Sequence, residues 1–80
     1  MNAFIAVEVY VDAIVNSNGK KILVGTPFEL VQKLCSIKLD IDRGNSRCYY
    51  WYVDAIFSGQ YKAGYFWVHD GKVTSVVYFD

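Results

Sequence analysis

Residues that build cross-links and catalytic or metal sites are scarce in this chain of 80 residues. Its two cysteines are too few for a disulfide framework, so both thiols are expected to stay reduced. The single histidine, with no Cys-x-x-Cys pair and no dense acidic loop, argues against a zinc or transition-metal site. We therefore expect no metal and no cofactor.

An excess of charge and a long apolar run are also missing. Eight lysines and arginines balance eight aspartates and glutamates, so no positive field favours duplex nucleic acid or an anionic membrane surface. No window approaches the roughly 18 to 20 apolar residues that cross a bilayer. The stretch from Met1 to Ile5 has no basic segment before its apolar residues, so we expect no secretion signal and a cytoplasmic location.

Apolar and aromatic residues, by contrast, are abundant. The chain is 54% hydrophobic and 18% aromatic, which is the opposite of the composition of disordered proteins. Its length suits one small folded unit. We expect residues 1–80 to form a single α+β domain.

The first quarter of the chain predicts a hairpin. Every second residue from Ala3 to Val15 is apolar, a pattern typical of a strand with one buried face. Asn18-Gly19 is a strong hairpin signal because both residues tolerate positive φ, and it leads into a returning strand over Lys20–Gly25. A two-residue turn would place Val15 opposite Ile22.

A helix is expected next. Thr26-Pro27-Phe28-Glu29 combines an N-cap residue, a proline at the first helical position and a capping-box glutamate. The helix should end near Lys38, and Asp40–Asn45 should form a loop. The predicted apolar stripe consists of Phe28, Val31, Leu34 and Cys35, with Leu30 and Ile37 beside it.

The second half predicts three strands, over Arg47–Phe57, Tyr61–His69 and Lys72–Phe79, with turns at Ser58-Gly59 and Asp70-Gly71. The predicted fold is therefore ββαβββ, one amphipathic helix packed on a curled antiparallel sheet. The sequence Tyr-Val-Asp-Ala-Ile occurs at 10–14 and again at 52–56. We interpret this echo as two strands of similar pattern rather than as a duplication.

Both faces of the predicted sheet are apolar. Two-residue turns would pair Trp51 with Phe66 and Phe66 with Ser75. Cys48, at a strand start, is expected to be more exposed than Cys35 on the helix stripe. The core face then carries Tyr49, Trp51, Val53, Ala55, Gly64, Phe66, Val68, Val73 and Val77. The opposite face carries Cys48, Tyr50, Tyr52, Asp54, Ala63, Tyr65, Trp67, Thr74, Val76 and Tyr78.

The second apolar face indicates a contact surface. Tyrosine and tryptophan suit such surfaces because they combine a large area with few rotatable bonds and a polar tip. We expect a protein partner or a second copy to bind Tyr50, Tyr52, Tyr65, Trp67 and Tyr78. One alternative is a sheet so strongly curled that both of its faces are partly internal. Another is a Ser58-Gly59 loop one residue longer, which would exchange the faces of one strand.

Few residues suggest catalysis or ligand binding. Asp12 and Asp54 would face the same way, and paired carboxylates can divide acid and base roles, although solubilising the aromatic face is the simpler role. His69 abuts the Asp70-Gly71 turn, where an imidazole is usually solvated. For single-stranded nucleic acid the best stretch is Arg47–Tyr52, because bases stack on aromatic rings, but acidic residues accompany the cations.

The C-terminal hairpin resembles one family. Gly64–Val73, with its Asp-Gly-Lys turn, and the ending Val77-Tyr78-Phe79-Asp80 are similar to the closing hairpin of the nuclear transport factor 2-like superfamily and its SnoaL-like cyclase and isomerase branches. The resemblance covers the last third, and the helices that begin that family's cone are missing. It implies a curled sheet around a helix, used for ligands or dimerisation, and carries over no catalytic residue.

Three functions follow from the sequence, in order of preference. The first is a non-enzymatic protein-interaction module, of the kind that many small phage or bacterial inhibitors and regulators represent. The second is a small-ligand or isomerase-like cone that uses Asp12, Asp54 or His69. The third is a single-stranded nucleic-acid binder.

Overall fold

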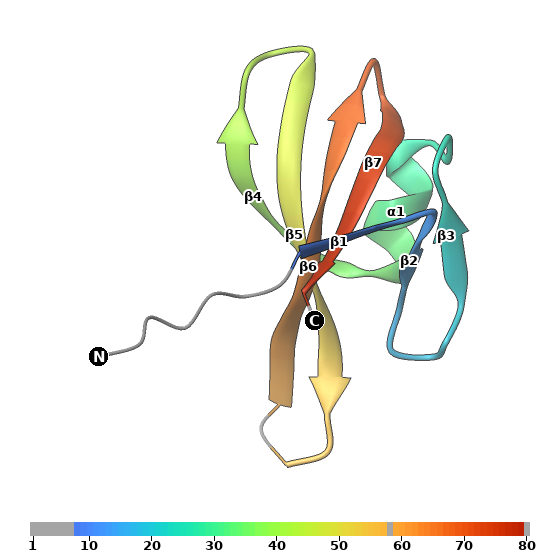
Figure 1. The fold of residues 1–80 in the computed structure, drawn as a ribbon, viewed down its shortest axis with the longest axis vertical. Coiled ribbons are helices and arrows are strands. Elements are labelled where there is room, and N and C mark those ends of the chain that lie inside the picture. Colours follow the sequence, from blue (N-terminus) through green and yellow to red (C-terminus); the bar gives the residue numbers. More distant parts are fainter. Residues whose placement is uncertain (1–7, 58, 80) are drawn as a thin grey trace.

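The computed structural model describes residues 8–57 and 59–79, which form one helix and two antiparallel sheets (Figure 1). Five strands form an open sheet in the order β1-β7-β6-β5-β4, and β2 pairs with β3 separately. The α+β class is confirmed, but the predicted element order is matched only in part. In chain order the elements are β1 (Glu8–Val11), β2 (Ala13–Val15), β3 (Lys21–Leu23), α1 (Phe28–Leu34), β4 (Ser36–Asp42), β5 (Ser46–Ala55), β6 (Gly59–His69) and β7 (Lys72–Phe79).

The predicted first strand is divided at Asp12. β1 joins the five-stranded sheet beside β7, whereas β2 leaves that sheet and pairs with β3. The Asp12 carbonyl accepts a hydrogen bond from the Val24 N–H at 2.9 Å, which holds the bend against the end of the hairpin. The first part of the predicted strand, 3–7, lies outside the described residues.

The β2–β3 hairpin exists, but its predicted register is wrong. Ile22 lies opposite Ile14 rather than Val15, and both isoleucines are buried. The loop is longer than two residues because Asn16 closes it. The Asn16 N–H donates to the Lys20 carbonyl at 3.0 Å, and the Asn16 Oδ1 accepts from the Lys20 N–H at 2.9 Å. The one-residue shift reverses the faces of β2 relative to β3, so Ile14 instead of Val15 joins Ile22 in the core.

Helix α1 begins without the predicted capping box. No side chain caps its N-terminus; instead, the Thr26 carbonyl accepts from the Val73 N–H at 3.0 Å, and the Phe28 N–H donates to the Gly71 carbonyl at 2.8 Å. The first turn is therefore held by the β6–β7 hairpin. The apolar stripe is confirmed, since Val31 is fully buried and Phe28, Leu34 and Cys35 pack against the core.

The helix is shorter than predicted because the chain becomes extended at Cys35, where φ is −134° and ψ is 146°. The following residues pair with β5, from Ser36 opposite Tyr52 to Asp42 opposite Arg47. The predicted helical tail to Lys38 and the first part of the predicted loop are thus an edge strand, β4. The alternation of apolar Ile37, Leu39 and Ile41 with polar residues is the sequence signal for this strand.

The β5–β6 register differs from the prediction by two residues. Trp51 lies opposite Gly64, and Tyr49 lies opposite Phe66. A second register shift, between Trp51 and Tyr52, turns Ala63 to the core instead of to the opposite face, where it was predicted. Up to Trp51, the even shift leaves the side chains on their predicted faces. Tyr49, Trp51 and Phe66 are accordingly buried in the core.

In β7, by contrast, one extra residue exchanges the faces. The predicted Asp70-Gly71 turn is confirmed, with φ of 49° and 76°, and Val68 lies opposite Val73. The register then shifts before Trp67, which lies opposite Ser75. A bulge of this kind reverses the direction of the side chains beyond it. Those of Val76 and Tyr78 therefore face the core, and those of Val77 and Phe79 face the other way.

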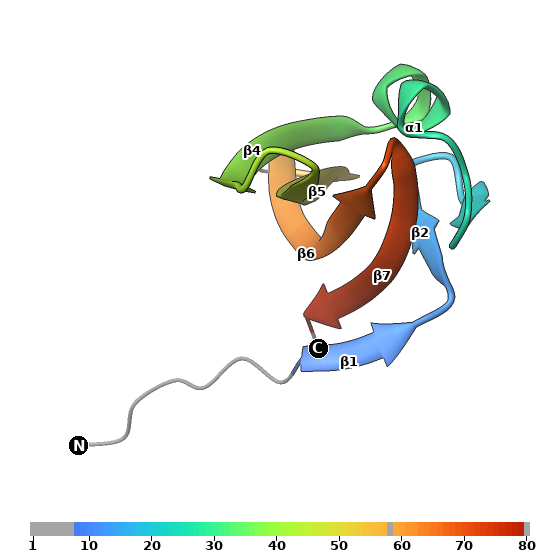
Figure 2. The same ribbon diagram turned by 90° about the horizontal axis from the view of Figure 1, so that it is seen from above.

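The core lies between one face of the large sheet and the α1 and β2–β3 layer (Figure 2). Trp51 and Phe66 are its largest fully buried side chains, and their ring centroids lie 6.4 Å apart. The Trp51 Nε1–H donates to the Val15 carbonyl at 3.3 Å. This bond ties the sheet to the small hairpin. The other buried members of the cluster are Ile14, Ile22, Val31, Tyr49, Val53, Ala63, Val68, Val73 and Val76.

Candidate aromatic interaction face

The face of the large sheet that points away from α1 and β2–β3 carries most of the remaining aromatic side chains, and we call it the aromatic face. Cross-strand pairs place Tyr50 beside Tyr65 and Tyr65 beside Val77. Val77 and Cys48 are buried, whereas the large rings around them are half-buried. The residues of the aromatic face are Cys48, Tyr50, Tyr52, Tyr65, Trp67, Val77 and Phe79, with Glu8 and Tyr10 at the β1 edge.

Three rings of this face pack against one another. The ring centroids of Tyr50 and Tyr65 lie 6.5 Å apart in an edge-to-face contact, and Phe79 lies 6.3 Å from Tyr50 and 5.9 Å from Tyr65. Such contacts are favourable beyond the area that they bury. The rings therefore form a preorganised cluster rather than separate side chains in solvent.

Charged groups border the rings. The Lys62 Nζ lies 3.8 Å from the centroid of the Tyr50 ring, and the Arg43 guanidinium carbon lies 5.4 Å from that of Trp67. The Tyr65 hydroxyl donates to a Glu8 carboxylate oxygen at 3.3 Å. Burial, and then the negative charge of Glu8, raise the pKa of Tyr65.

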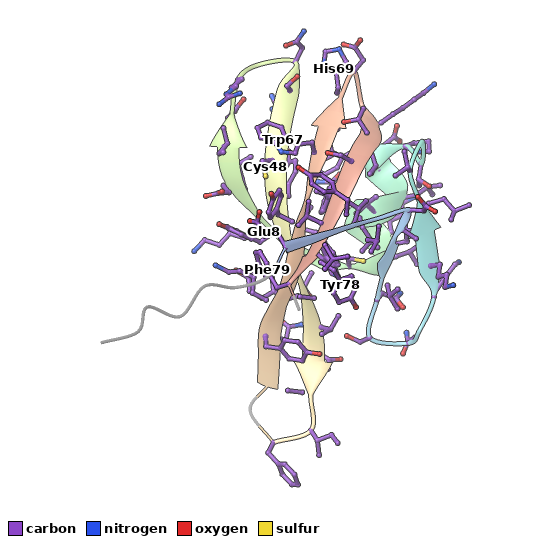
Figure 3. All side chains as sticks on the ribbon, in the orientation of Figure 1. Glu8, Cys48, Trp67, His69, Tyr78 and Phe79 are labelled. Carbon is purple, nitrogen blue, oxygen red and sulfur yellow. The ribbon has the colours of Figure 1, made fainter. Side chains whose placement is uncertain are left out.

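Three of the five predicted contact residues, Tyr50, Tyr65 and Trp67, lie together on the aromatic face. Tyr52 belongs to the same face but lies further along β5, opposite Lys62. Tyr78 is placed wrongly by the sequence prediction, because the β7 bulge turns it to the core side. Figure 3 shows Tyr78 on the side of α1 and β2, away from Cys48, Trp67 and Phe79. Its ring meets the Trp51 ring edge-on at 5.3 Å.

Besides Tyr10 at the β1 edge, Phe79 is an aromatic residue of this face that sequence reasoning missed. It takes the position expected for Tyr78, and only the unpredicted bulge between Val73 and Ser75 decides between the two. No turn residue marks this bulge in the sequence, since Val73-Thr74-Ser75 reads as ordinary strand.

The residues considered for ligand binding do not form one site. Asp12 lines an open groove of about 600 Å³ between β1 and the β2–β3 hairpin. Asp54 lies at the base of the β5–β6 tip, where its carboxylate accepts from Gln60 at 3.3 Å. His69 lies at the far end of the β6–β7 hairpin (Figure 3).

His69 has two polar neighbours. Its Nδ1 lies 2.8 Å from the Ser46 Oγ, and its Nε2 lies 3.3 Å from an Asp70 oxygen. Hydroxyl, imidazole and carboxylate thus follow one another as in a nucleophile, base and orienting acid. The His69 and Asp70 side chains are 47% and 75% exposed, and such groups are effective mainly where water is excluded. We interpret the arrangement as hydrogen bonding at a hairpin tip.

The thiols are not reactive sites. Cys48, expected to be the more exposed, is 3% exposed. Burial, with a small contribution from the charge of Asp40, raises the pKa of Cys48 to about 11, and burial raises that of Cys35 to about 11 as well. A thiol with such a pKa is almost entirely protonated at neutral pH and is a poor nucleophile.

A second exposed apolar feature lies at the tip of the β5–β6 hairpin, which projects from the body (Figure 1). Ile56 is 91% exposed and Phe57 is 98% exposed. The base of the hairpin is braced, because the Asp54 N–H donates to the Ser17 Oγ at 2.8 Å. The predicted strand Arg47–Phe57 included both residues, whereas β5 ends at Ala55. Their position directly before Ser58-Gly59 is the sequence signal that they belong to the loop.

Residues 8–57 and 59–79 offer neither a metal site nor a membrane-spanning helix. No group of three or more histidine, cysteine, aspartate or glutamate side chains is arranged to hold a metal ion there, and no helix there is long and apolar enough to span a bilayer. Comparisons with protein-family models, curated proteins and solved structures found no match for this chain.

Proposed function

We propose that this protein is a non-enzymatic interaction module that binds a protein through the aromatic face. The observation that carries the proposal is the cluster of Tyr50, Tyr65 and Phe79, with Trp67 nearby, on a sheet face that neither α1 nor the β2–β3 hairpin covers. Half-buried rings of this size are common at contact surfaces and are costly to leave in water.

The distribution of charge supports a protein as the ligand. Protein interfaces have an apolar, aromatic centre and a polar rim of mixed sign. Here the rings lie at the centre, Lys62 and Arg43 contribute positive charge, and Glu8 contributes negative charge. A partner with an apolar patch bordered by both signs of charge would match this surface. An inhibitor or regulator that covers the working surface of another protein is one form of this function.

The experiment compares capture of partners by matched variants. In Tyr65→Ala/Trp67→Ala the centre of the aromatic face is removed. In Tyr61→Ala an exposed ring of the same strand, β6, is removed; Tyr61 is 54% exposed and lies opposite Val53 on the other face. A protein captured from native cell extracts by wild type and Tyr61→Ala, but not by the double variant, would then be purified and titrated directly.

The expected result is at least a tenfold loss of affinity in the double variant and a change below twofold in Tyr61→Ala, because truncation of a central aromatic residue commonly costs about 2 kcal/mol or more. Circular dichroism checks that both variants are folded. Equal affinity for all three proteins would refute the proposal. Loss of the partner's own activity on binding would identify the module as an inhibitor.

A second candidate, binding of single-stranded nucleic acid, is favoured by one observation: Lys62 and Arg43 lie over the rings of Tyr50 and Trp67, as cations and stacking platforms do in such proteins. It ranks lower because the negatively charged Glu8 carboxylate, hydrogen-bonded to Tyr65 on the same face, would repel the phosphate backbone. Salt-sensitive binding of an oligonucleotide, lost in Trp67→Ala, would support it. The small-ligand alternative ranks third, because Asp12, Asp54 and His69 have separate surroundings.

A further inference from the structure

The two edge strands of the large sheet, β1 and β4, are protected to very different degrees. A free edge presents unpaired backbone N–H and C=O groups, and proteins protect it with lysine, inward charges or bulges. β4 carries Lys38, Asp40 and Asp42, and its register shifts between Leu39 and Ile41. It therefore has both a bulge and charges of each sign, and is a poor template for another strand.

β1 has no bulge, and its one charged residue is Glu8. It is a regular four-residue strand, Glu8–Val11, whose register with β7 is unbroken. It contains no lysine and no proline, and Val9 and Tyr10 are 41% and 76% exposed. Within the part of the chain that the structure describes, no strand pairs with its outer edge.

From this difference we infer that β1 pairs antiparallel with β1 of a second copy of the chain, which gives a two-fold symmetric dimer with one continuous sheet. One open and one protected edge is the combination that a closed pair requires, because two open edges would permit endless growth. The balance of eight positive and eight negative residues means that two copies do not repel each other at long range.

Charge selects the register. With a two-fold axis normal to the sheet, the axis can pass beside either Val9 or Tyr10. The residue at the axis then lies opposite the same residue of the second copy. With Tyr10 at the axis, Glu8 would face Asp12 of the second copy, and like charges directly opposite are unfavourable. With Val9 at the axis, Glu8 of each copy faces Tyr10 of the other. A carboxylate and a hydroxyl then lie opposite each other on both sides of the axis. The second register is the one we assign.

This dimer would join the two aromatic faces, because an axis normal to the sheet keeps Tyr10 and Glu8 of both copies on the same side. Tyr10 lies beside Val77 within its own chain, so the aromatic surface would run across the dimer axis. The inference does not depend on the proposed function: a monomer could still bind a partner through Tyr65 and Trp67.

The test is sedimentation equilibrium of the full chain from micromolar to several hundred micromolar. Wild type is expected to reach a dimer and no larger species. Val9→Lys and Val9→Glu should each sediment as monomers, and their equimolar mixture should recover the dimer, because residue 9 lies opposite itself. The matched control is Leu39→Lys on the β4 edge, where Leu39 is 47% exposed; it should dimerise like wild type.

Four outcomes would overturn the inference. The wild type could stay monomeric, the Val9→Lys protein could still dimerise, the equimolar mixture of Val9→Lys and Val9→Glu could stay monomeric, or Leu39→Lys could lose the dimer. Hydrogen exchange of the wild type tests the pairing without any variant that could misfold. The amides of β1 should become more protected as protein concentration rises, and unchanged exchange counts against the pairing. Tyr65→Ala/Trp67→Ala should remain dimeric, which separates this inference from the proposed function.

Discussion

Replacing Gly64 by alanine should destabilise this fold more than any other single methyl addition to a glycine. Gly64 lies in the middle of β6, between Trp51 of β5 and Tyr78 of β7. The Trp51 ring lies across it, so an added Cβ would come within 2.5 and 2.6 Å of two ring carbons and would also overlap the Val77 carbonyl oxygen. Neither neighbour has free space to move into.

The magnitude follows from the rigidity of these neighbours. The Trp51 side chain is fully buried, and its Nε1–H donates to the Val15 carbonyl, while the Val77 oxygen belongs to a paired strand. Overpacking typically costs about 1–3 kcal/mol, and we expect about 3 kcal/mol here. The whole domain should have about 4–12 kcal/mol of stability, so the melting temperature should fall by about 12–24 °C.

Urea and thermal unfolding, followed by tryptophan fluorescence and circular dichroism, would measure this loss. Gly71→Ala is the matched control, because its Cβ would meet nothing within 4 Å and only its φ of 76° opposes the substitution. That strain costs about 1 kcal/mol. A Gly64→Ala protein destabilised by less than its Gly71→Ala counterpart would refute the placement of Gly64 between the indole and β7.

Three further predictions test other parts of the structure. Tyr78→Ala should lose about 2–3 kcal/mol in urea unfolding because its ring packs on the core; a loss below about 1 kcal/mol would place Tyr78 on the aromatic face instead. Asn16→Ala should lose about 2 kcal/mol, since its side chain makes three hydrogen bonds, including one to the helix C-terminus; an unchanged midpoint would contradict this. The pKa of about 11 for Cys35 and Cys48 should slow their alkylation at pH 8 about 100-fold relative to the unfolded chain. A thiol pKa raised by folding also means that unfolding free energy, constant below about pH 8.5, falls as pH rises toward 11; alkylation at the unfolded rate would refute the burial.

The sequence alone predicted the helix start and most of the strands. Turn residues did most of this, since Asp70-Gly71 adopts positive φ at both positions as the sequence required. The helix stripe centred on Val31 was also readable, because a period near 3.6 is a local property of the chain. β4 was missed because Ser36–Asp42 becomes a strand only by pairing with β5.

The composition of the aromatic face was readable only in part. Tyr50, Tyr65 and Trp67 were predicted correctly, because the β5–β6 register error was even. Tyr78 and Phe79 were exchanged, because the bulge in β7 adds one residue to the count. Likewise, the Asn16 loop moved Ile14 rather than Val15 into the core.

The sequence by itself thus determined the α+β class, the helix start, the positions of most strands and the excess of aromatic residues over what one helix can cover. The tertiary structure decided which side of the sheet each residue of β2 and β7 faces. It also decided where the first predicted strand bends from β1 into β2, and which sheet edge stays unprotected. The physical reason is the two-residue period of a strand: one inserted residue reverses every side chain beyond it, and such an insertion is fixed by contacts with distant strands rather than by neighbouring residues.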